Sequence, residues 1–363
     1  MEVFEIIMIS IDDKNEVIDR TEDEIVPYCY SITSYGADYP VDMLVKRLDD
    51  EVIFVPAFQR QYVWTLKQAS RFIESLLLGL PVPGIFLSKE QDTQKLIIID
   101  GQQRLSTLYF FYNGIFKPSG IEFKLKGVQK NFEGKSFKDL TNEEKLKLND
   151  SIIHATIVKQ DEPSEDESSI YHIFERLNTG GTSLQPQEIR ACIYRGDFND
   201  LIHSLNKNKS WRYIYGKESN KLKDEELILR FFALYFNLDN YKIPLKEFLN
   251  KFMAHNRTLK FLNSEDLNNT FINSIDFIKD VLKKDAFRLV GRGLAAAIFD
   301  SVMVGTTDRI KKGPVKDKSD YLKKYKSLLE NDEYLKFVNS GTSAENVVKG
   351  RLEIARKTFS EVI

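Results

Sequence analysis

The stretch Ile99-Asp100-Gly101-Gln102-Gln103-Arg104 joins an apolar strand to an amphipathic helix. Residues 95–99 form a short run rich in β-branched side chains, which predicts a buried strand. After the stretch, Leu105 and Leu108 fall on one helical face, and Asn113-Gly114 predicts the end of this helix. The fold of an α/β core therefore depends on this junction between strand and helix.

The residue types at the junction allow two interpretations. Asp100 is expected to cap the helix, with Gln103 in the capping-box position three residues later. Gly101 allows the backbone to approach a ligand closely, and Arg104 adds a cation beside the amides of the first helical turn. This combination suits an anion such as a phosphate. The alternative is a well-capped turn with an exposed arginine, because a single glycine turn is a weak motif.

A second polar turn with an arginine precedes the first by some forty residues. Gln59-Arg60 lies in the segment 55–64, which leads into a predicted helix over residues 66–78. Thr65 and Gln68 predict a capping box at the start of this helix. The strand expected at residues 85–87 then returns the chain toward the strand at 95–99. The two arginine turns are therefore expected to face one another across one small sheet.

Several blocks, in this order, resemble the GmrSD-type N-terminal domain, a family of ParB/sulfiredoxin-like fold found in modification-dependent restriction and phage-defence proteins. The blocks are Phe58-Gln59-Arg60 with Trp64, the stretch Glu74 to Pro83, Asp100 to Arg104, and Phe174-Glu175-Arg176-Leu177-Asn178-Thr179-Gly180-Gly181-Thr182-Ser183-Leu184 followed by Glu188-Ile189-Arg190. Together they cover about residues 40–195. The Asp-Gly-Gln-Gln-Arg and Asn-x-Gly-Gly-x-x-Leu motifs are specific in combination.

The resemblance implies nucleotide binding, often with hydrolysis, coupled to DNA restriction. It implies an NTP, such as GTP, with Mg²⁺, and assigns phosphate binding to a set of residues in the two arginine turns: Gln59, Arg60, Gly101, Gln102 and Arg104. In the same interpretation Asn178, Gly180 and Gly181 lie beside the base or ribose. The alternative for both glycines is structural, because a helix end joined directly to a new helix requires a positive φ.

The expected catalytic roles fall on three residues of the first motif. Arg104 neutralises phosphate charge, Gln103 orients a water molecule, and Asp100 coordinates Mg²⁺ directly or through water. A different class of function, a Mg²⁺-dependent endonuclease, is suggested by Asp100 followed by Glu122-x-Lys124. This pattern is weak, because alternating charges are typical of any half-exposed strand. A DNA-binding adaptor without turnover is the third possibility.

The pattern of elements predicts an α+β fold: a small mixed sheet with helices, followed by an all-α C-terminal half. We expect an N-terminal extension over residues 1–40, a nucleotide-binding domain over 41–196 and a helical domain over 197–363. Strand signals fade after Gly196, and helical spacing of apolar residues continues to the end of the chain. The spacing of the aromatic residues near Phe231 predicts core packing rather than stacking on bases.

The composition is that of an ordinary globular protein, with 363 residues, a net charge of −2 and two cysteines. No apolar run reaches the ~18 residues that a membrane span needs, so we expect a cytoplasmic protein without membrane contact. The near-neutral charge gives no global attraction to DNA, so DNA contact requires a local basic patch or a partner. The lysines of residues 311–326 are the best candidates, although a solvated helix face is the favoured explanation, because Asp317, Asp320 and Glu330 interrupt them.

Related proteins that cut DNA usually carry an HNH nuclease domain, either downstream or in a partner chain. The four histidines here are His154, His172, His203 and His255. None lies in a His-Asn-His or paired metal-ligand arrangement. The sequence therefore predicts an NTP-binding regulatory subunit that works with an HNH nuclease or another defence-system protein, and assembly as a homo-oligomer stays open.

Overall fold

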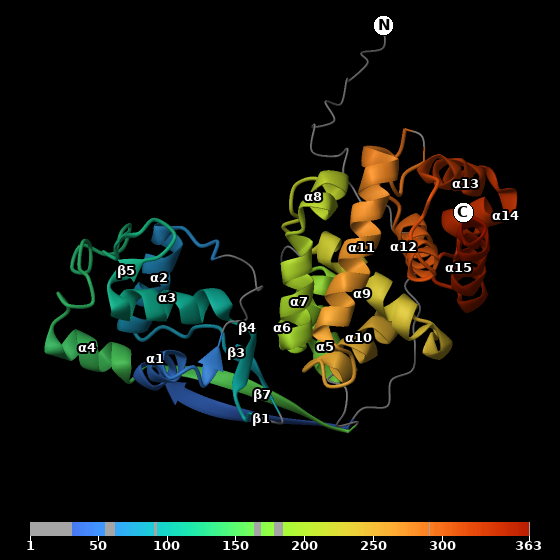
Figure 1. The fold of residues 1–363 in the computed structure, drawn as a ribbon. Coiled ribbons are helices and arrows are strands. Elements are labelled where there is room, and N and C mark those ends of the chain that lie inside the picture. The colour runs from blue at the N-terminus through green and yellow to red at the C-terminus, as the bar shows by residue number, and fades with distance from the viewer. Residues whose placement is uncertain are drawn as a thin grey trace, which may run out of the picture. The chain divides into compact units, whose positions relative to one another are not determined.

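The computed structural model describes residues 31–54, 62–90, 93–162, 168–177, 184–289 and 291–362. These residues form two compact units, each with its own core (Figure 1). The sheet unit holds residues up to 184 together with 191–193, and the helical unit holds 185–190 and 194 onward. The boundary passes through a single helix, α6 (Pro186–Ile193).

The sheet unit contains a five-stranded mixed sheet with the strand order β1-β7-β3-β4-β2. The β1–β7 and β3–β4 pairs are antiparallel, whereas β3–β7 and β2–β4 are parallel. A separate pair of short strands is formed by β5 and β6. The elements of the sheet unit are β1 (Ser31–Pro40), α1 (Val41–Asp49), β2 (Ile53–Phe54), α2 (Leu66–Leu77), β3 (Ile85–Lys89), β4 (Leu96–Asp100), α3 (Gln102–Asn113), β5 (Ile115–Phe116), β6 (Ile121–Glu122), α4 (Asn142–Asn149), β7 (Ile152–Glu162) and α5 (Ser168–Leu177).

The strand β4 is covered on both faces, which explains its continuous apolar sequence. Leu96 and Ile98 belong to a core shared with α1 to α4, which lie together above the sheet in Figure 1. Ile97 and Ile99 alternate to the other face and are also buried, and α5 contacts β4. The predicted strands at 85–87 and 95–99 are therefore confirmed as β3 and β4.

The helix α2, which follows Gln59-Arg60 in the chain, begins as the sequence predicts. The Thr65 hydroxyl accepts a hydrogen bond from the Gln68 amide at 3.3 Å, and the Gln68 side chain accepts one from the Thr65 amide at 2.9 Å. These reciprocal bonds form the predicted capping box of α2. This helix is amphipathic and buries Ile73 and Leu76 in the core of the sheet unit.

The helical unit confirms the predicted all-α second half, and with the sheet unit it gives a mixed α+β chain. Its core helix, α12, buries nearly every side chain from Ala296 to Thr307, and α9, α11 and α15 pack around it. The elements are α7 (Asp197–Asn206), α8 (Lys209–Tyr215), α9 (Lys223–Phe236), η3 (Leu238–Asn240), α10 (Leu245–Asn256), α11 (Ser264–Leu282), η4 (Lys283–Asp285), α12 (Ala296–Lys311), α13 (Lys318–Glu330), α14 (Asp332–Asn339) and α15 (Glu345–Ser360).

Buried charge is a second feature of this helical core. Asp300 of α12 is fully buried and contacts two buried guanidinium groups. Its Oδ2 lies 2.7 Å from Nη2 of Arg230 and 3.0 Å from Nη2 of Arg351. The triad connects α9, α12 and α15 through directional bonds. Phe231 and Phe232 are fully buried, which agrees with the core packing predicted for the aromatic residues. None of the described helices combines the length and apolar character required to cross a bilayer.

Candidate functional site

The turn between β4 and α3 depends on the backbone conformation of Gly101. This residue has a φ of 101°, in the left-handed region, and precedes the first residue of α3. Its carbonyl accepts the first helical hydrogen bond, from the Leu105 amide at 2.9 Å. A Cβ at this position would lie 2.4 Å from Cγ2 of the buried Ile85. Both the backbone conformation and the close approach to β3 therefore require glycine.

The predicted capping arrangement at this helix is wrong. Gly101, not Asp100, occupies the N-cap position, and α3 has no side-chain cap. The helix begins one residue later than expected, so Asp100 and Gln103 are out of register for a capping box. Oδ2 of Asp100 accepts a hydrogen bond from Nη2 of Arg104 at 2.7 Å instead.

Arg104 is a mostly buried cation at the end of β4. Only 15% of its side chain is exposed, against 51% for its ion-pair partner Asp100. Its Nη2 also donates to the Gly84 carbonyl at 2.9 Å, which connects α3 to the turn before β3. Its Nε is buried and has no hydrogen-bond partner within the described part of the chain. The arginine is therefore not the exposed residue of the alternative interpretation, and it retains a buried donor.

The side chain of Gln103 connects α3 to the segment that enters α2. Its Oε1 accepts hydrogen bonds from the Val63 amide at 2.9 Å and the Trp64 amide at 3.2 Å. A second connection lies beside it, because the Tyr62 and Thr107 hydroxyls are 2.6 Å apart. Burial raises the pKa of Tyr62 to about 12. These bonds attach residues 62–64, which directly follow Gln59-Arg60-Gln61 in the chain, to the first turns of α3.

Replacing Gln103 tests this structural assignment. Gln103→Ala removes the acceptor for two backbone amides, so we expect a loss of about 1–2 kcal/mol in the free energy of unfolding. Gln103→Glu keeps an acceptor at the same place and should restore most of this stability. Urea unfolding measures both values. An alanine variant as stable as the wild-type protein would contradict the assignment.

Several predicted nucleotide-binding residues lie outside the described residues: Gln59, Arg60, Asn178, Gly180 and Gly181. The structure describes the elements on either side of the glycine pair. The helix α5 ends at Leu177, and α6 begins at Pro186, where the Gln185 amide donates to Oε2 of Glu188 at 2.7 Å. Roles for the residues between these helices stay predictions.

The residues suggested for a nuclease centre lie far apart. Glu122 pairs in β6 with Ile115, which follows α3, whereas Asp100 precedes α3. The helix has 12 residues, so it separates the two carboxylates by roughly 18 Å at 1.5 Å per residue. Glu122 instead forms an exposed ion pair with Lys124 at 3.0 Å. Asp100 and Glu122 therefore cannot share one metal ion in this arrangement.

Metal binding by side chains alone receives no support from the described residues, among which no group of three or more His, Cys, Asp or Glu side chains could hold an ion. Asp100 supplies a single carboxylate, half exposed and bonded to Arg104. This donor set fits a Mg²⁺ ion that obtains most of its ligands from phosphate oxygens and water, which is common for Mg²⁺ in nucleotide sites.

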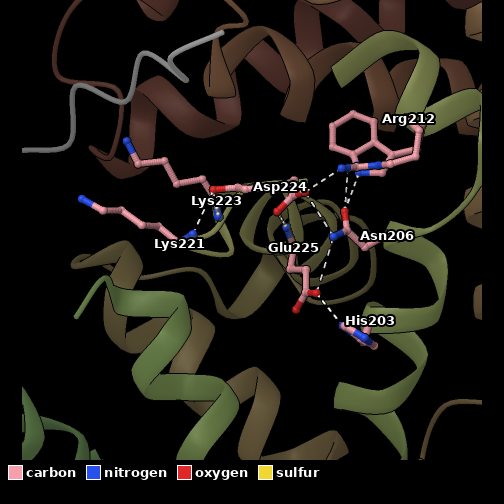
Figure 2. A network of polar contacts seen from close by, with 9 residues as sticks. His203, Asn206, Arg212, Lys221, Lys223, Asp224 and Glu225 are labelled. Atoms are coloured by element: carbon pink, nitrogen blue, oxygen red, sulfur yellow. Dashed lines mark hydrogen bonds and ion pairs between the residues drawn. The ribbon is translucent and has the colours of Figure 1, made fainter. Parts of the chain in front are cut away.

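A second polar cluster lies in the helical unit, where it joins α7, α8 and α9 (Figure 2). The fully buried Asp224 accepts hydrogen bonds from Nη1 of Arg212 at 2.9 Å and from Nδ2 of Asn206 at 3.1 Å. Its neighbour Glu225 contacts Nδ1 of His203 at 2.8 Å through Oε1. Among the described residues, Oε2 of Glu225 and Nε of Arg212 are buried without a hydrogen-bond partner. The other charged groups pair across the three helices, so the cluster is best explained as a connection between helices.

The cluster gives a prediction for the pH dependence of stability. Burial raises the pKa of Glu225, so the folded state holds its proton more tightly than the unfolded state does. The stabilisation that comes from this tighter proton binding is present below the pKa of an unfolded glutamate, about 4.3. It is lost as the pH rises through the pKa of Glu225 in the folded state. Glu225→Gln should therefore gain stability relative to the wild-type protein between pH 5 and pH 8. Melting temperatures that differ by a constant amount across this range would contradict it.

Three of the lysines proposed as a nucleic-acid patch make contacts within the helical unit. Nζ of Lys311 lies 4.8 Å from the centre of the Tyr235 ring. Nζ of Lys324 pairs with Glu361, and that of Lys318 lies 3.9 Å from Oδ2 of Asp280. Such contacts neutralise part of the positive charge of α13. A direct role of these lysines in DNA contact stays a prediction without structural support.

Comparison with known proteins agrees with the arrangement of the sheet unit. Residues 41–195 match the family model described as GmrSD restriction endonuclease, N-terminal domain. No curated protein matches the chain. The matched segment begins with α1, contains the β4–α3 turn and ends just after α6. Residues 41–195 of this chain are therefore a domain of the GmrSD restriction endonuclease N-terminal family.

Proposed function

We propose that the sheet unit binds a nucleoside triphosphate at the turn formed by Gly101 to Arg104. The GmrSD-type domain indicates a component of a restriction or phage-defence system. The observation that carries the more specific proposal is the state of Arg104. Its guanidinium group is mostly buried, and Nε has no hydrogen-bond partner among the described residues. A buried cationic donor in this state favours an anionic ligand.

The backbone around Arg104 supports the same ligand class. The helix α3 starts on a glycine with no side-chain cap, so its positive end has no protein carboxylate in the capping position. Phosphate groups bind at such helix starts through backbone amides and the helix dipole. We assign phosphate contacts to Gly101, Gln102 and Arg104. Gln59 and Arg60 would add contacts, and the segment that follows them is attached to α3 through Gln103.

The remaining roles are those that the resemblance to the GmrSD-type domain implies. Asn178, Gly180 and Gly181 would contact the base or ribose. Asp100 would hold a Mg²⁺ ion, which supplies neutralisation of phosphate charge when bound. Because Oε1 of Gln103 is engaged by two backbone amides, only its amide nitrogen remains to hold a water molecule for hydrolysis.

In this proposal the protein acts in the cytoplasm as an NTP-dependent regulator or sensor. It would act with DNA through a partner protein such as an HNH nuclease, because carboxylates pair with two of the lysines of α13, Lys318 and Lys324. Assembly into a homo-oligomer would be a further route to a complete DNA-binding surface. Hydrolysis would then link recognition of foreign DNA to the action of the partner.

The proposal is tested by thermal melting and phosphate release. Each of the four NTPs is added with Mg²⁺ at millimolar concentration, with and without plasmid DNA. A ligand bound only by the folded state raises the melting temperature, by an amount equivalent to about 2.7 kcal/mol at a hundredfold excess over Kd. Phosphate release that increases with DNA supports a coupled NTPase. No shift with any NTP would show the proposal to be wrong.

A further inference from the structure

We propose that Asp100 is an internal competitor for the phosphate-binding arginine, so that two-point phosphate binding through Nε and Nη2 of Arg104 requires the Asp100 carboxylate to move away. This inference rests on the proposed function. It adds a regulatory role for Asp100 that depends only on described residues. Three groups carry it: the Asp100 carboxylate, the Arg104 guanidinium group and the Gly84 carbonyl.

The hydrogen bonds of Arg104 show why competition is expected. Nη2 carries two hydrogens, and both are used, one by Oδ2 of Asp100 at 2.7 Å and one by the Gly84 carbonyl at 2.9 Å. An arginine binds phosphate most strongly through two parallel N–H groups. Nε and Nη2 form such a pair on one edge of the guanidinium group. Within this pair, Nε has no partner among the described residues, whereas Nη2 has two. A phosphate can therefore use this pair only after one acceptor leaves Nη2.

Asp100 is the acceptor that can leave. The carboxylate side chain is 51% exposed, so water can replace the arginine when the side chain rotates. Gly84, in contrast, belongs to the backbone immediately before β3. A Cβ on it would lie 2.7 Å from the His154 carbonyl of the neighbouring strand, so this segment is tightly packed. The Gly84 bond therefore fixes the guanidinium group in place, and the Asp100 bond controls access to it.

The size of the effect follows from the exposure of the pair. Half-exposed ion pairs are weak, so the competition should lower the affinity for nucleotide by about 3- to 10-fold rather than prevent binding. A divalent cation that attracts the Asp100 carboxylate would remove the competition. Metal and nucleotide should therefore strengthen each other's binding by equal factors, as linkage requires.

The test measures the Kd of the tightest-binding NTP in EDTA by titration calorimetry. Four proteins form a double-mutant cycle: the wild-type protein, Asp100→Asn, Arg104→Ala and the double variant. Asp100→Asn should bind about 3- to 10-fold more tightly than the wild-type protein. The same substitution should change the Kd less than twofold when Arg104 is absent. The control Glu143→Gln removes an exposed carboxylate elsewhere in the sheet unit and should leave the Kd unchanged.

The outcomes separate this inference from the function on which it rests. Equal tightening in the presence and absence of Arg104 would show that Asp100 only repels phosphate through space, which overturns the inference. No tightening by Asp100→Asn also overturns it, although the protein would still be a nucleotide-binding protein. If none of the four proteins binds any NTP with or without Mg²⁺, the proposed function itself is wrong, and this inference is wrong with it.

Discussion

Asp300→Ala is expected to lower the free energy of unfolding by about 3–5 kcal/mol, because it removes the buried carboxylate that two buried guanidinium groups share. Arg230 and Arg351 are 1% and 0% exposed as side chains, and both donate to the Asp300 carboxylate. Water cannot replace the carboxylate at this depth. Urea unfolding, monitored through the circular dichroism signal of the helices, measures this loss of stability.

A matched control separates burial from charge. Asp280 also contacts lysine side chains in the helical unit, at 3.1 and 3.9 Å, but is 48% exposed. Asp280→Ala should therefore cost less than about 1 kcal/mol. If the Asp280 and Asp300 variants lost similar amounts of stability, the triad would not be the structural centre of the helical unit.

Gly101→Ala should destabilise the sheet unit by about 2–6 kcal/mol, the sum of two separate costs. A non-glycine residue at a φ of 101° carries a backbone penalty of about 1–3 kcal/mol. The new Cβ would also lie 2.4 Å from Ile85, and forcing extra atoms into a packed core costs about 1–3 kcal/mol. The variant should also lose NTP binding, because the turn that carries Arg104 must shift.

Gly134→Ala is the control for the backbone cost alone. Gly134 has a φ of 79°, and a Cβ there would meet nothing within 4 Å. This variant should lose about 1 kcal/mol and bind NTP like the wild-type protein. Equal losses of stability in the two variants would mean that the contact of the new Cβ with Ile85 adds nothing to the cost of Gly101→Ala.

The sequence predicts those features that arise within a few residues along the chain. The capping box of Thr65 and Gln68 depends on partners three residues apart. The apolar runs of β3 and β4 likewise identify buried strands by themselves. Such signals are sufficient for the α+β class and for the position of the β4–α3 turn.

The contacts made across the fold could not be predicted in this way. The residues that bond to Gln103 lie 39 and 40 positions earlier in the chain, and Gly84 lies 20 positions before Arg104. The predicted capping role of Asp100 is wrong because the N-cap of α3 is Gly101, one residue later. The partners of Asp300 are 70 and 51 positions away, so a single sequence gives no signal that pairs them.

The most direct test of the central claim is the Kd for NTP with Mg²⁺ of the wild-type protein and of Arg104→Ala. Loss of a charge-assisted hydrogen bond should weaken binding by about 1.5–3 kcal/mol. Arg71→Ala, which removes an exposed arginine from α2, is the control and should bind like the wild-type protein. Both variants are assayed below their melting temperatures, because Arg104→Ala also loses its bond to Gly84. A wild-type Kd that Arg104→Ala leaves unchanged, or no binding of any NTP by the wild-type protein, would contradict the account.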